Sequence, residues 1–132
     1  GLYVAGEVIK LMTGRRIHVK GSRVLVLGLT FKENCPDIRN SKVVDVIREL
    51  QKYGIKVDVH DPWVNGAEAK HEYGIRPVRD LKRGSYDAVV LAVAHNEFRE
   101  MGVAAVRKLC RRNHVLYDIK YAFPADQVDG RL

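Results

Sequence analysis

The chain has 132 residues, of which 46% are hydrophobic and 30% charged, a length and balance that suit one soluble domain with one sizeable core. Its formal net charge is +7, and residues 1–42 supply +5 of it, from eight Lys or Arg against three Asp or Glu. We expect no membrane span and no signal peptide, since no apolar run is long enough for the first and residues 1–12 lack the pattern of the second. Two cysteines are too few for a disulfide framework, and no basic stripe is interleaved with aromatic residues as in a nucleic-acid site. We therefore expect a cytoplasmic protein with a small anionic partner.

The first element predicted along the chain is a helix over residues 2–13. Its apolar face consists of Ala5, Val8, Ile9 and Met12. The helix has no capping residue, and no later segment is an evident partner for that face. We therefore expect residues 1–20 to be the end of a helix that continues from upstream, with its linker, and residues 21–132 to form the α/β domain.

Strands and helices alternate after the linker. The run Arg23–Leu29 is continuously apolar, as in a strand buried on both faces. The other expected strands are residues 56–61, 75–78, 87–94 and 115–119, and the expected helices are residues 41–53, 67–73 and 97–110. Alternation of this kind predicts parallel strands joined by helical crossovers. The expected fold is a doubly wound, mostly parallel, five-stranded Rossmann-like sheet of order 3-2-1-4-5, with strands numbered along the chain.

That order locates the site, because ligands of such sheets lie outside the carboxyl ends of the strands where the winding reverses. Here the reversal falls between the first and fourth expected strands. Two loops border the resulting crevice, Gly28–Asn40 and Ala94–Glu97. We expect the binding residues to come from these loops.

The first loop lacks the three glycines of a dinucleotide-binding turn, so we do not expect NAD to bind this domain. It offers Lys32 and Arg39 instead, which could meet a diphosphate together with the helix start near Ser41. Alternatively both are solvated loop charges, with Arg39 paired to Asp37.

Other polar residues leave two interpretations open. His95 lies at the crevice, either as a ligand contact or as a strand-end residue before a helix. Asp61 either contacts a ribose or closes a turn. Cys35 is either a reactive thiol or, as we favour, an ordinary loop residue, and Cys110 is expected in the core. No metal-ligand spacing occurs.

The stretch Gly28-Leu-Thr-Phe-Lys-Glu-Asn-Cys-Pro-Asp-Ile-Arg-Asn-Ser41 resembles the opening of the C-terminal domain of UDP-glucose and GDP-mannose dehydrogenases. Three further segments match in the same order. They are Asp61-Pro62, Ala92-Val-Ala-His95 followed by Phe98, and Asp118-Ile-Lys120. The Cys-Pro and Asn within the long loop are most similar to the branch that acts on UDP-N-acetylhexosamines.

The resemblance implies an NAD-dependent oxidoreductase that oxidises C6 of UDP-glucose or a UDP-N-acetylhexosamine to the uronic acid. In that family an N-terminal domain binds NAD, a central helical domain forms a homodimer, and the C-terminal domain binds the UDP-sugar. By this resemblance, residues 1–20 are the tail of the central dimerisation helix and its linker. The catalytic cysteine motif lies in the central domain, so this chain alone should be inactive, with no catalytic residue and no metal of its own. The substrate-binding residues implied here are Phe31, Lys32, Asp37, Arg39, His95 and Lys120.

Two other functions remain open at this point. One is a freestanding nucleotide-binding regulatory domain. The other is an interaction module whose basic surface meets an acidic partner.

Overall fold

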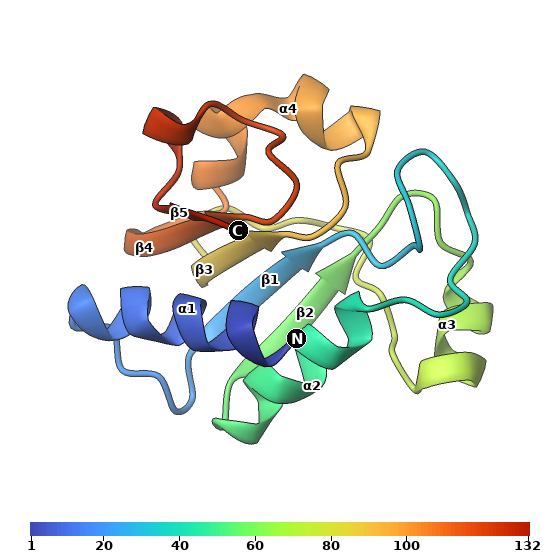
Figure 1. Cartoon of the computed structure of the whole chain (residues 1–132), viewed down its shortest axis with the longest axis horizontal. Helices are drawn as coiled ribbons and strands as arrows, with labels where there is room; N and C mark the ends of the chain where they lie inside the picture. The colour runs from blue at the N-terminus through green and yellow to red at the C-terminus, as the bar shows by residue number, and fades with distance from the viewer.

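The computed structural model describes all of residues 1–132 as a parallel β-sheet with helices on both faces (Figure 1). After the first helix, three further α-helices alternate with the five strands. In chain order the elements are α1 (Leu2–Gly14), β1 (Arg23–Leu27), α2 (Val43–Lys52), β2 (Lys56–His60), α3 (Gly66–Tyr73), β3 (Tyr86–Leu91), α4 (Asn96–Arg107), β4 (Cys110–Asp118), the short 3-10 helix η1 (Ala125–Gln127) and β5 (Gly130–Arg131).

The sheet has the order β2-β1-β3-β4-β5, and every pair is parallel. β1 lies in the middle, with Val26 opposite Val59 on β2 and Val90 on β3. The chain winds outward in one direction from β1 to β2 and in the other from β3 to β5. The predicted fold class, a doubly wound sheet, is therefore confirmed.

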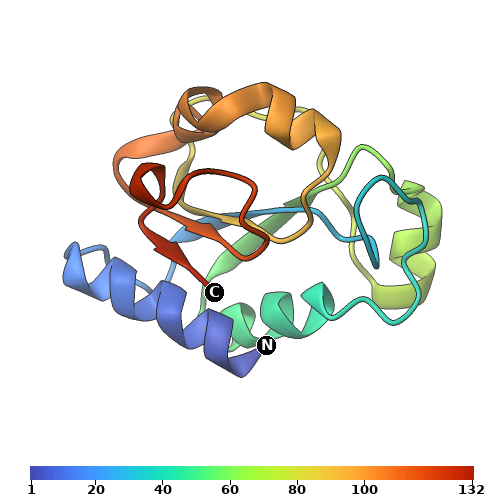
Figure 2. The ribbon, with the colours of Figure 1, turned by 45° about the horizontal axis from the view of Figure 1, so that its top comes forward.

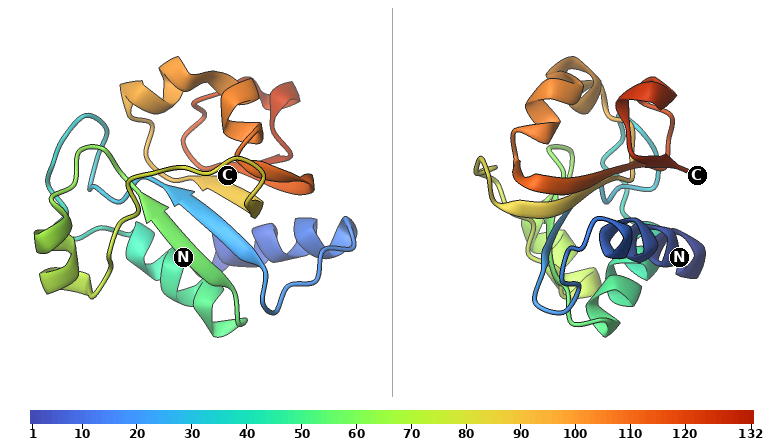
Figure 3. Two further views of the ribbon diagram at one scale, coloured as in Figure 1. Left: turned by 180° about the vertical axis from the view of Figure 1, so that it is seen from behind. Right: turned by 90° about the vertical axis from the view of Figure 1, so that its left-hand side faces the viewer.

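Alternate residues of the central strands pack on opposite faces, which explains why β1 and β3 are continuously apolar. Val24 and Val26 face α1 and α2, whereas Leu25 and Leu27 face α4. All four have no exposed surface. Figure 3 shows the two helical layers when the sheet is viewed along its edge.

Helix α1 packs into this core, although the sequence offered no evident partner for its apolar face. Val4, Ala5, Val8 and Met12 are buried in one hydrophobic cluster with α2 and with strand residues including Tyr117. Partner residues were hard to predict because they come from segments more than thirty residues away, such as α2, and from β4 near the end of the chain. The proposed division at residue 20 remains an expectation.

The edges of the sheet differ from the prediction. Residues 75–78 form no strand and meet β2 through one backbone hydrogen bond, from Val78 N–H to the Val59 carbonyl at 2.8 Å. Pro77 has no N–H to donate, which limits pairing there. The fifth strand is β5 instead, two residues at the opposite edge that pair with β4.

Helix α4 is interrupted, and this also corrects the prediction of one continuous helix over 97–110. Gly102 has φ 81° and ψ 160°, which are not helical values, and it divides the helix into two short helical segments. The register of buried residues therefore shifts after Gly102, so Phe98 and Val106 are buried while Ala105 is only half-buried. None of the helices combines the length and apolar character that crossing a membrane requires.

Candidate functional site

A glycine lets β1 and β3 approach closely where the winding of the sheet reverses. Gly28 follows β1 with φ 104°, and a Cβ placed there would lie 2.5 Å from Val93 Cβ and 2.7 Å from Val93 N. Its N–H donates to the His60 carbonyl at 2.9 Å. Only glycine fits this backbone and this contact. Beyond it the chain turns away from β3 and opens a crevice.

The long loop between β1 and α2 (residues 28–42, the β1–α2 loop) is held by its own polar contacts. Phe31 N–H donates to the Asp37 carbonyl at 2.7 Å, and the Ser41 hydroxyl donates to the Leu29 carbonyl at 2.6 Å. From α3, the Tyr73 hydroxyl donates to the Ile38 carbonyl at 2.5 Å. The loop is thus closed on itself and pinned to α3 without a glycine-rich turn.

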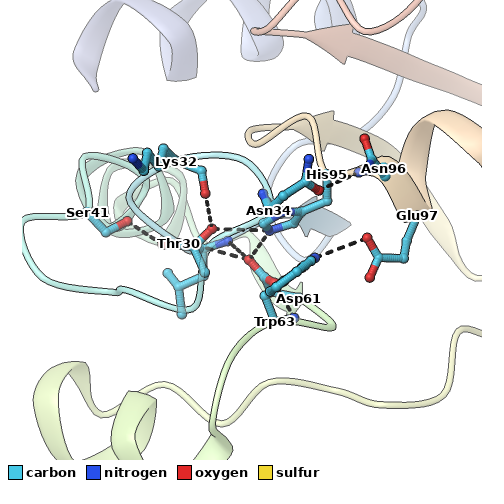
Figure 4. Close-up of polar contacts among 10 residues, drawn as sticks. Thr30, Lys32, Asn34, Ser41, Asp61, Trp63, His95, Asn96 and Glu97 are labelled. Carbon is cyan, nitrogen blue, oxygen red and sulfur yellow. Dashed lines mark hydrogen bonds and ion pairs between the residues drawn. The ribbon is translucent and has the colours of Figure 1, made fainter.

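Three buried polar side chains join the carboxyl ends of β1, β2 and β3 (Figure 4). Asp61 accepts hydrogen bonds from Leu29 N–H at 2.7 Å and Thr30 N–H at 3.1 Å. The same oxygen of Asp61 lies 2.9 Å from His95 Nε2, and Thr30 Oγ1 lies 3.1 Å from that nitrogen. The three residues are 5%, 1% and 0% exposed in the order Asp61, Thr30, His95. They fix the start of the β1–α2 loop against its two neighbouring strands.

The pKa of Asp61 reflects this arrangement. Burial raises the pKa, but the hydrogen bonds from His95 and from the Leu29 and Trp63 N–H groups lower it by more, so the pKa lies below its usual range. Asp61 is therefore a carboxylate that anchors backbone. Of its two interpretations, the turn-closing one matches these contacts, since Asp61 also accepts the N–H of Trp63 two residues on, at 2.8 Å.

A pocket of about 410 Å³ lies at the carboxyl edge of the sheet, at the reversal point (the carboxyl-edge pocket). The β1–α2 loop, the start of α2, the ends of β3 and β4, and both chain ends form its walls. The lining residues are Gly1, Val4, Thr30, Phe31, Asn40, Lys42, Val43, Val46, Ala92, Val93, Ile119, Lys120 and Leu132. The predicted crevice is therefore present, with Ala92 and Val93 on its β3 side instead of residues 94–97.

The pocket is positively charged. Lys42 and Lys120 line it, no Asp or Glu does, and neither lysine forms an ion pair. The amino end of α2 also lies there, with no side chain capping its N–H groups. Helix amino ends carry partial positive charge, so the site combines two cations with a favourable dipole. An anion such as a phosphate is complementary to it.

Phe31 adds an exposed aromatic surface to the pocket. Phe31 is 57% exposed, which is unusual for a phenylalanine. Apolar lining residues such as Ile119 and Val43 lie in the same pocket. The pocket can therefore take a ligand with a flat apolar part and an anionic part.

Lys120 is placed by a turn that repeats the one at Asp61. Asp118, with no exposed surface, ends β4 and accepts the Lys120 N–H at 3.0 Å and the Phe123 N–H at 2.9 Å. The next residue, Tyr121, has φ 56° and carries Arg131 3.9 Å above its ring. The β4–η1 connection is thus a fixed wall of the pocket.

The six predicted site residues fall into three groups. Phe31 and Lys120 line the carboxyl-edge pocket. Asp37 and Arg39 line an adjoining hollow of about 150 Å³ together with Phe31. Lys32 and His95 line neither: Lys32 is exposed on the loop, and His95 is buried with both ring nitrogens engaged.

Asp37 and Arg39 form the pair that the sequence left as one of two alternatives. Arg39 Nε and one terminal nitrogen each donate to Asp37 at 3.0 Å, and the Arg39 N–H donates at 2.9 Å. The side-chain hydrogen bond lowers the pKa of Asp37 to about 2, and the pKa of Arg39 is raised in return. The pair closes the tip of the loop beside the pocket.

Sequence reasoning missed Lys42 and Asn40. A signal for Lys42 was present, because a cation directly after Ser41 stands at the start of the helix that faces the crevice. The cysteines add no site: Cys35 is half-exposed on the loop, and burial raises the pKa of the Cys110 thiol to about 12. No three His, Cys, Asp or Glu side chains gather closely enough to hold a metal.

Comparison with known proteins gives a consistent result. Residues 25–125 match the family described as the UDP-glucose/GDP-mannose dehydrogenase family, UDP binding domain. The chain is 58% identical over its whole length to UDP-N-acetyl-D-glucosamine 6-dehydrogenase of Pseudomonas aeruginosa and 52% identical to the enzyme of that name from Salmonella typhi. It spans 31% of the length of each of these relatives.

Solved structures share the fold. A UDP-glucose dehydrogenase from Pyrobaculum islandicum matches 98% of this chain over 29% of its own, with a TM-score of 0.71 and 28% identity. An NDP-N-acetyl-D-galactosaminuronic acid dehydrogenase from Methanosarcina mazei matches 95% of this chain over 27% of its own, with a TM-score of 0.77 and 22% identity.

Proposed function

Because this chain belongs to the UDP-glucose/GDP-mannose dehydrogenase family as its UDP-binding domain, we propose that it is the nucleotide-sugar-binding part of an NAD-dependent UDP-sugar 6-dehydrogenase. The parent enzyme oxidises C6 of the sugar to a carboxylate in two hydride transfers. NAD and the catalytic cysteine belong to the other parts of that enzyme, which is a homodimer through its central domain.

The observation that carries the proposal is the carboxyl-edge pocket. It lies at the reversal point, where doubly wound sheets bind ligands, and its chemistry fits a nucleoside diphosphate. Lys42, Lys120 and the amino end of α2 supply positive charge for the diphosphate, and Phe31 offers a ring surface for the base. The high identity to two UDP-N-acetyl-D-glucosamine 6-dehydrogenases favours a UDP-N-acetylhexosamine as the sugar nucleotide.

The remaining predicted residues act on the loop in this proposal. The Asp37–Arg39 pair keeps the tip closed beside Phe31. Lys32, exposed on the same loop, approaches the ligand when the rest of the enzyme encloses it. His95 is buried under the β1–α2 loop and supports it by hydrogen bonds, so it does not contact the ligand directly.

A titration of the chain with UDP, followed by NMR chemical-shift perturbation, tests the proposal. We expect shifts at the carboxyl-edge pocket. Lys120→Ala and Lys42→Ala should each weaken UDP affinity by about tenfold to a hundredfold, because a charge-assisted hydrogen bond contributes about 1.5–3 kcal/mol. Lys32→Ala is expected to weaken UDP-sugar affinity similarly in the full-length enzyme, with NAD affinity unchanged.

The matched control is Lys20→Ala. Lys20 lines a larger hollow of about 520 Å³ at the opposite, amino edge of the sheet, together with Arg111 and Arg112. That hollow holds three cations against the carboxylate of Asp87, the same net side-chain charge as the carboxyl-edge pocket, so it is a direct competitor for any purely electrostatic binding. Shifts confined to it, or loss of affinity in Lys20→Ala alone, would contradict the proposed site.

A further inference from the structure

The ring of His95, which follows β3, connects the β1–α2 loop to Asp61 at the end of β2. Its two nitrogens have different hydrogen-bond partners. Asn34 N–H lies 2.9 Å from Nδ1, while Nε2 lies 2.9 Å from the buried carboxylate of Asp61. The ring is completely buried between the Trp63 ring, stacked at 6.0 Å, and the Phe98 ring at 5.5 Å. Rotation of the ring by 180° would break both hydrogen bonds, to Asn34 and to Asp61.

These contacts define the protonation of the ring. A backbone N–H can only donate, so Nδ1 must be the bare, accepting nitrogen. In a neutral ring Nε2 then carries the proton and donates it to Asp61. The Thr30 hydroxyl, 3.1 Å from Nε2, donates onward to the Lys32 carbonyl at 2.9 Å. One imidazole thereby orders loop residues on both sides of Phe31.

Asn34 contacts both His95 and Asn96. Its φ is 54°, in the left-handed region that asparagine adopts more readily than most residues other than glycine. Its side-chain oxygen accepts the Asn96 N–H at 2.9 Å, so Asn34 is docked on the β3–α4 connection by two hydrogen bonds. Within this segment Thr30 N–H also donates to Asp61, which follows β2, and Phe31 N–H donates to the Asp37 carbonyl; the anchors at Ile38 and Ser41 lie beyond it. Residues 30–34 are held from the β3 side by His95 and Asn96 only.

We propose that His95 is a positioning residue, whose neutral Nε2–H tautomer holds residues 30–34 in place and so presents Phe31 to the nucleotide sugar before it binds. The part that concerns the ligand rests on the proposed function. The part that concerns the loop does not, because it follows from the contacts of the ring alone. Preformed loops bind more tightly because less ordering accompanies binding.

Two substitutions separate the two halves of the ring. The amide oxygen of Asn falls near the position of Nδ1, so His95→Asn keeps the acceptor for Asn34 and loses the donor to Asp61. The amide nitrogen of Gln falls near Nε2, so His95→Gln keeps the donor and loses the acceptor. Both variants remove the same aromatic ring from the contact with Trp63 and Phe98. A purely structural role for the ring predicts that they behave alike.

The experiment measures hydrogen exchange of the Asn34 amide and UDP affinity in the parent chain and in both variants. We expect the Asn34 amide to exchange much faster in His95→Gln and close to the parent rate in His95→Asn. UDP affinity should follow the amide, falling about tenfold in His95→Gln, as loss of one hydrogen bond allows, and clearly less in His95→Asn. Equal behaviour of the two variants in both measurements would overturn the proposal.

The ring itself gives a second readout, which needs no variant and no ligand. Long-range ¹⁵N–¹H correlation in the parent chain should show the proton on Nε2 and a bare Nδ1. A proton on Nδ1 would overturn the proposal even if neither variant folds. If the parent fails to bind UDP, the proposed function fails, while the ring tautomer and the Asn34 amide still decide the role of His95.

Discussion

At the scale of single residues, the Asp37–Arg39 pair makes a prediction about pH. The Arg39 side chain lowers the pKa of Asp37 to about 2 from its ordinary 3.8, so the pair contributes to loop order above pH 3.8 and loses it as pH falls through about 2. We expect NMR titration of the Asp37 carboxyl to give a midpoint near 2. In Arg39→Gln the midpoint should move toward 3.8 but stay below it, since the residue 39 N–H still donates.

The control for that titration is Arg76→Gln, because Arg76 is an exposed arginine that forms no ion pair. Its loss should leave the Asp37 midpoint in place. If the Asp37 midpoint shifted equally in both variants, the low pKa would come from the net positive charge of the chain. The contact between Asp37 and Arg39 would then not be its cause.

Gly28 carries a second prediction at this scale. Gly28→Ala places a Cβ 2.5 Å from Val93 Cβ at φ 104°. Left-handed strain of roughly 1–2 kcal/mol adds to overpacking of roughly 1–3 kcal/mol, so we expect a loss of about 2–5 kcal/mol in the free energy of unfolding. Urea unfolding measures it. Gly6→Ala is the matched control: Gly6 lies in α1 with open space around it, and the change should stabilise by up to about 1 kcal/mol.

At the scale of elements, α1 is predicted to contribute directly to the stability of the sheet. Met12 has no exposed surface and packs in the cluster shared with α2 and β1. Met12→Ala should therefore cost about 2–5 kcal/mol. Leu2→Ala, in the same helix but 72% exposed, should change the free energy of unfolding by no more than about 0.5 kcal/mol. Similar melting temperatures for both variants would mean that the packing of α1 contributes little to the stability of the domain.

Periodicity explains which elements were predictable from the sequence. β1 and β3 are uninterrupted apolar runs because both faces of the sheet are covered, and that pattern is visible without a structure. β5 is two residues long and has no pattern of its own, so only its pairing with β4 identifies it. The break at Gly102 likewise depends on a backbone torsion that composition does not reveal.

The site was predictable to the extent that topology places it. The winding of the sheet put the crevice beside residues 28–40, and Phe31 and Lys120 do line a pocket there. Which side chains face the pocket depends on how the loop closes. That closure uses contacts such as Tyr73 with Ile38, between residues 35 positions apart, which local sequence does not specify. The burial of His95 was not predictable from the sequence either, because it depends on contacts with distant residues such as Trp63 and Asn34.

At the scale of the whole molecule, we predict that this chain binds a nucleotide sugar and performs no oxidation by itself. The turn after β1 has a single glycine, Gly28, and the backbone of Gly28 packs directly against Val93 after β3. The Cys110 thiol is not poised as a nucleophile, since burial raises its pKa to about 12. Absorbance at 340 nm with NAD and UDP-N-acetylglucosamine checks this. Any reduction of NAD above a protein-free blank would contradict our assignment of parts.

The two ends of the chain both lie at the carboxyl-edge pocket: Gly1 and Leu132 line it, and Figure 2 shows the termini on the same side of the molecule. Any peptide fused to either end, such as a purification tag, therefore leaves the domain beside the opening where we place the ligand. A polyhistidine tag there would bring its own charge and bulk to the opening. Affinities should be measured on tag-free protein, and a fluorophore attached to either end is well placed to report ligand entry.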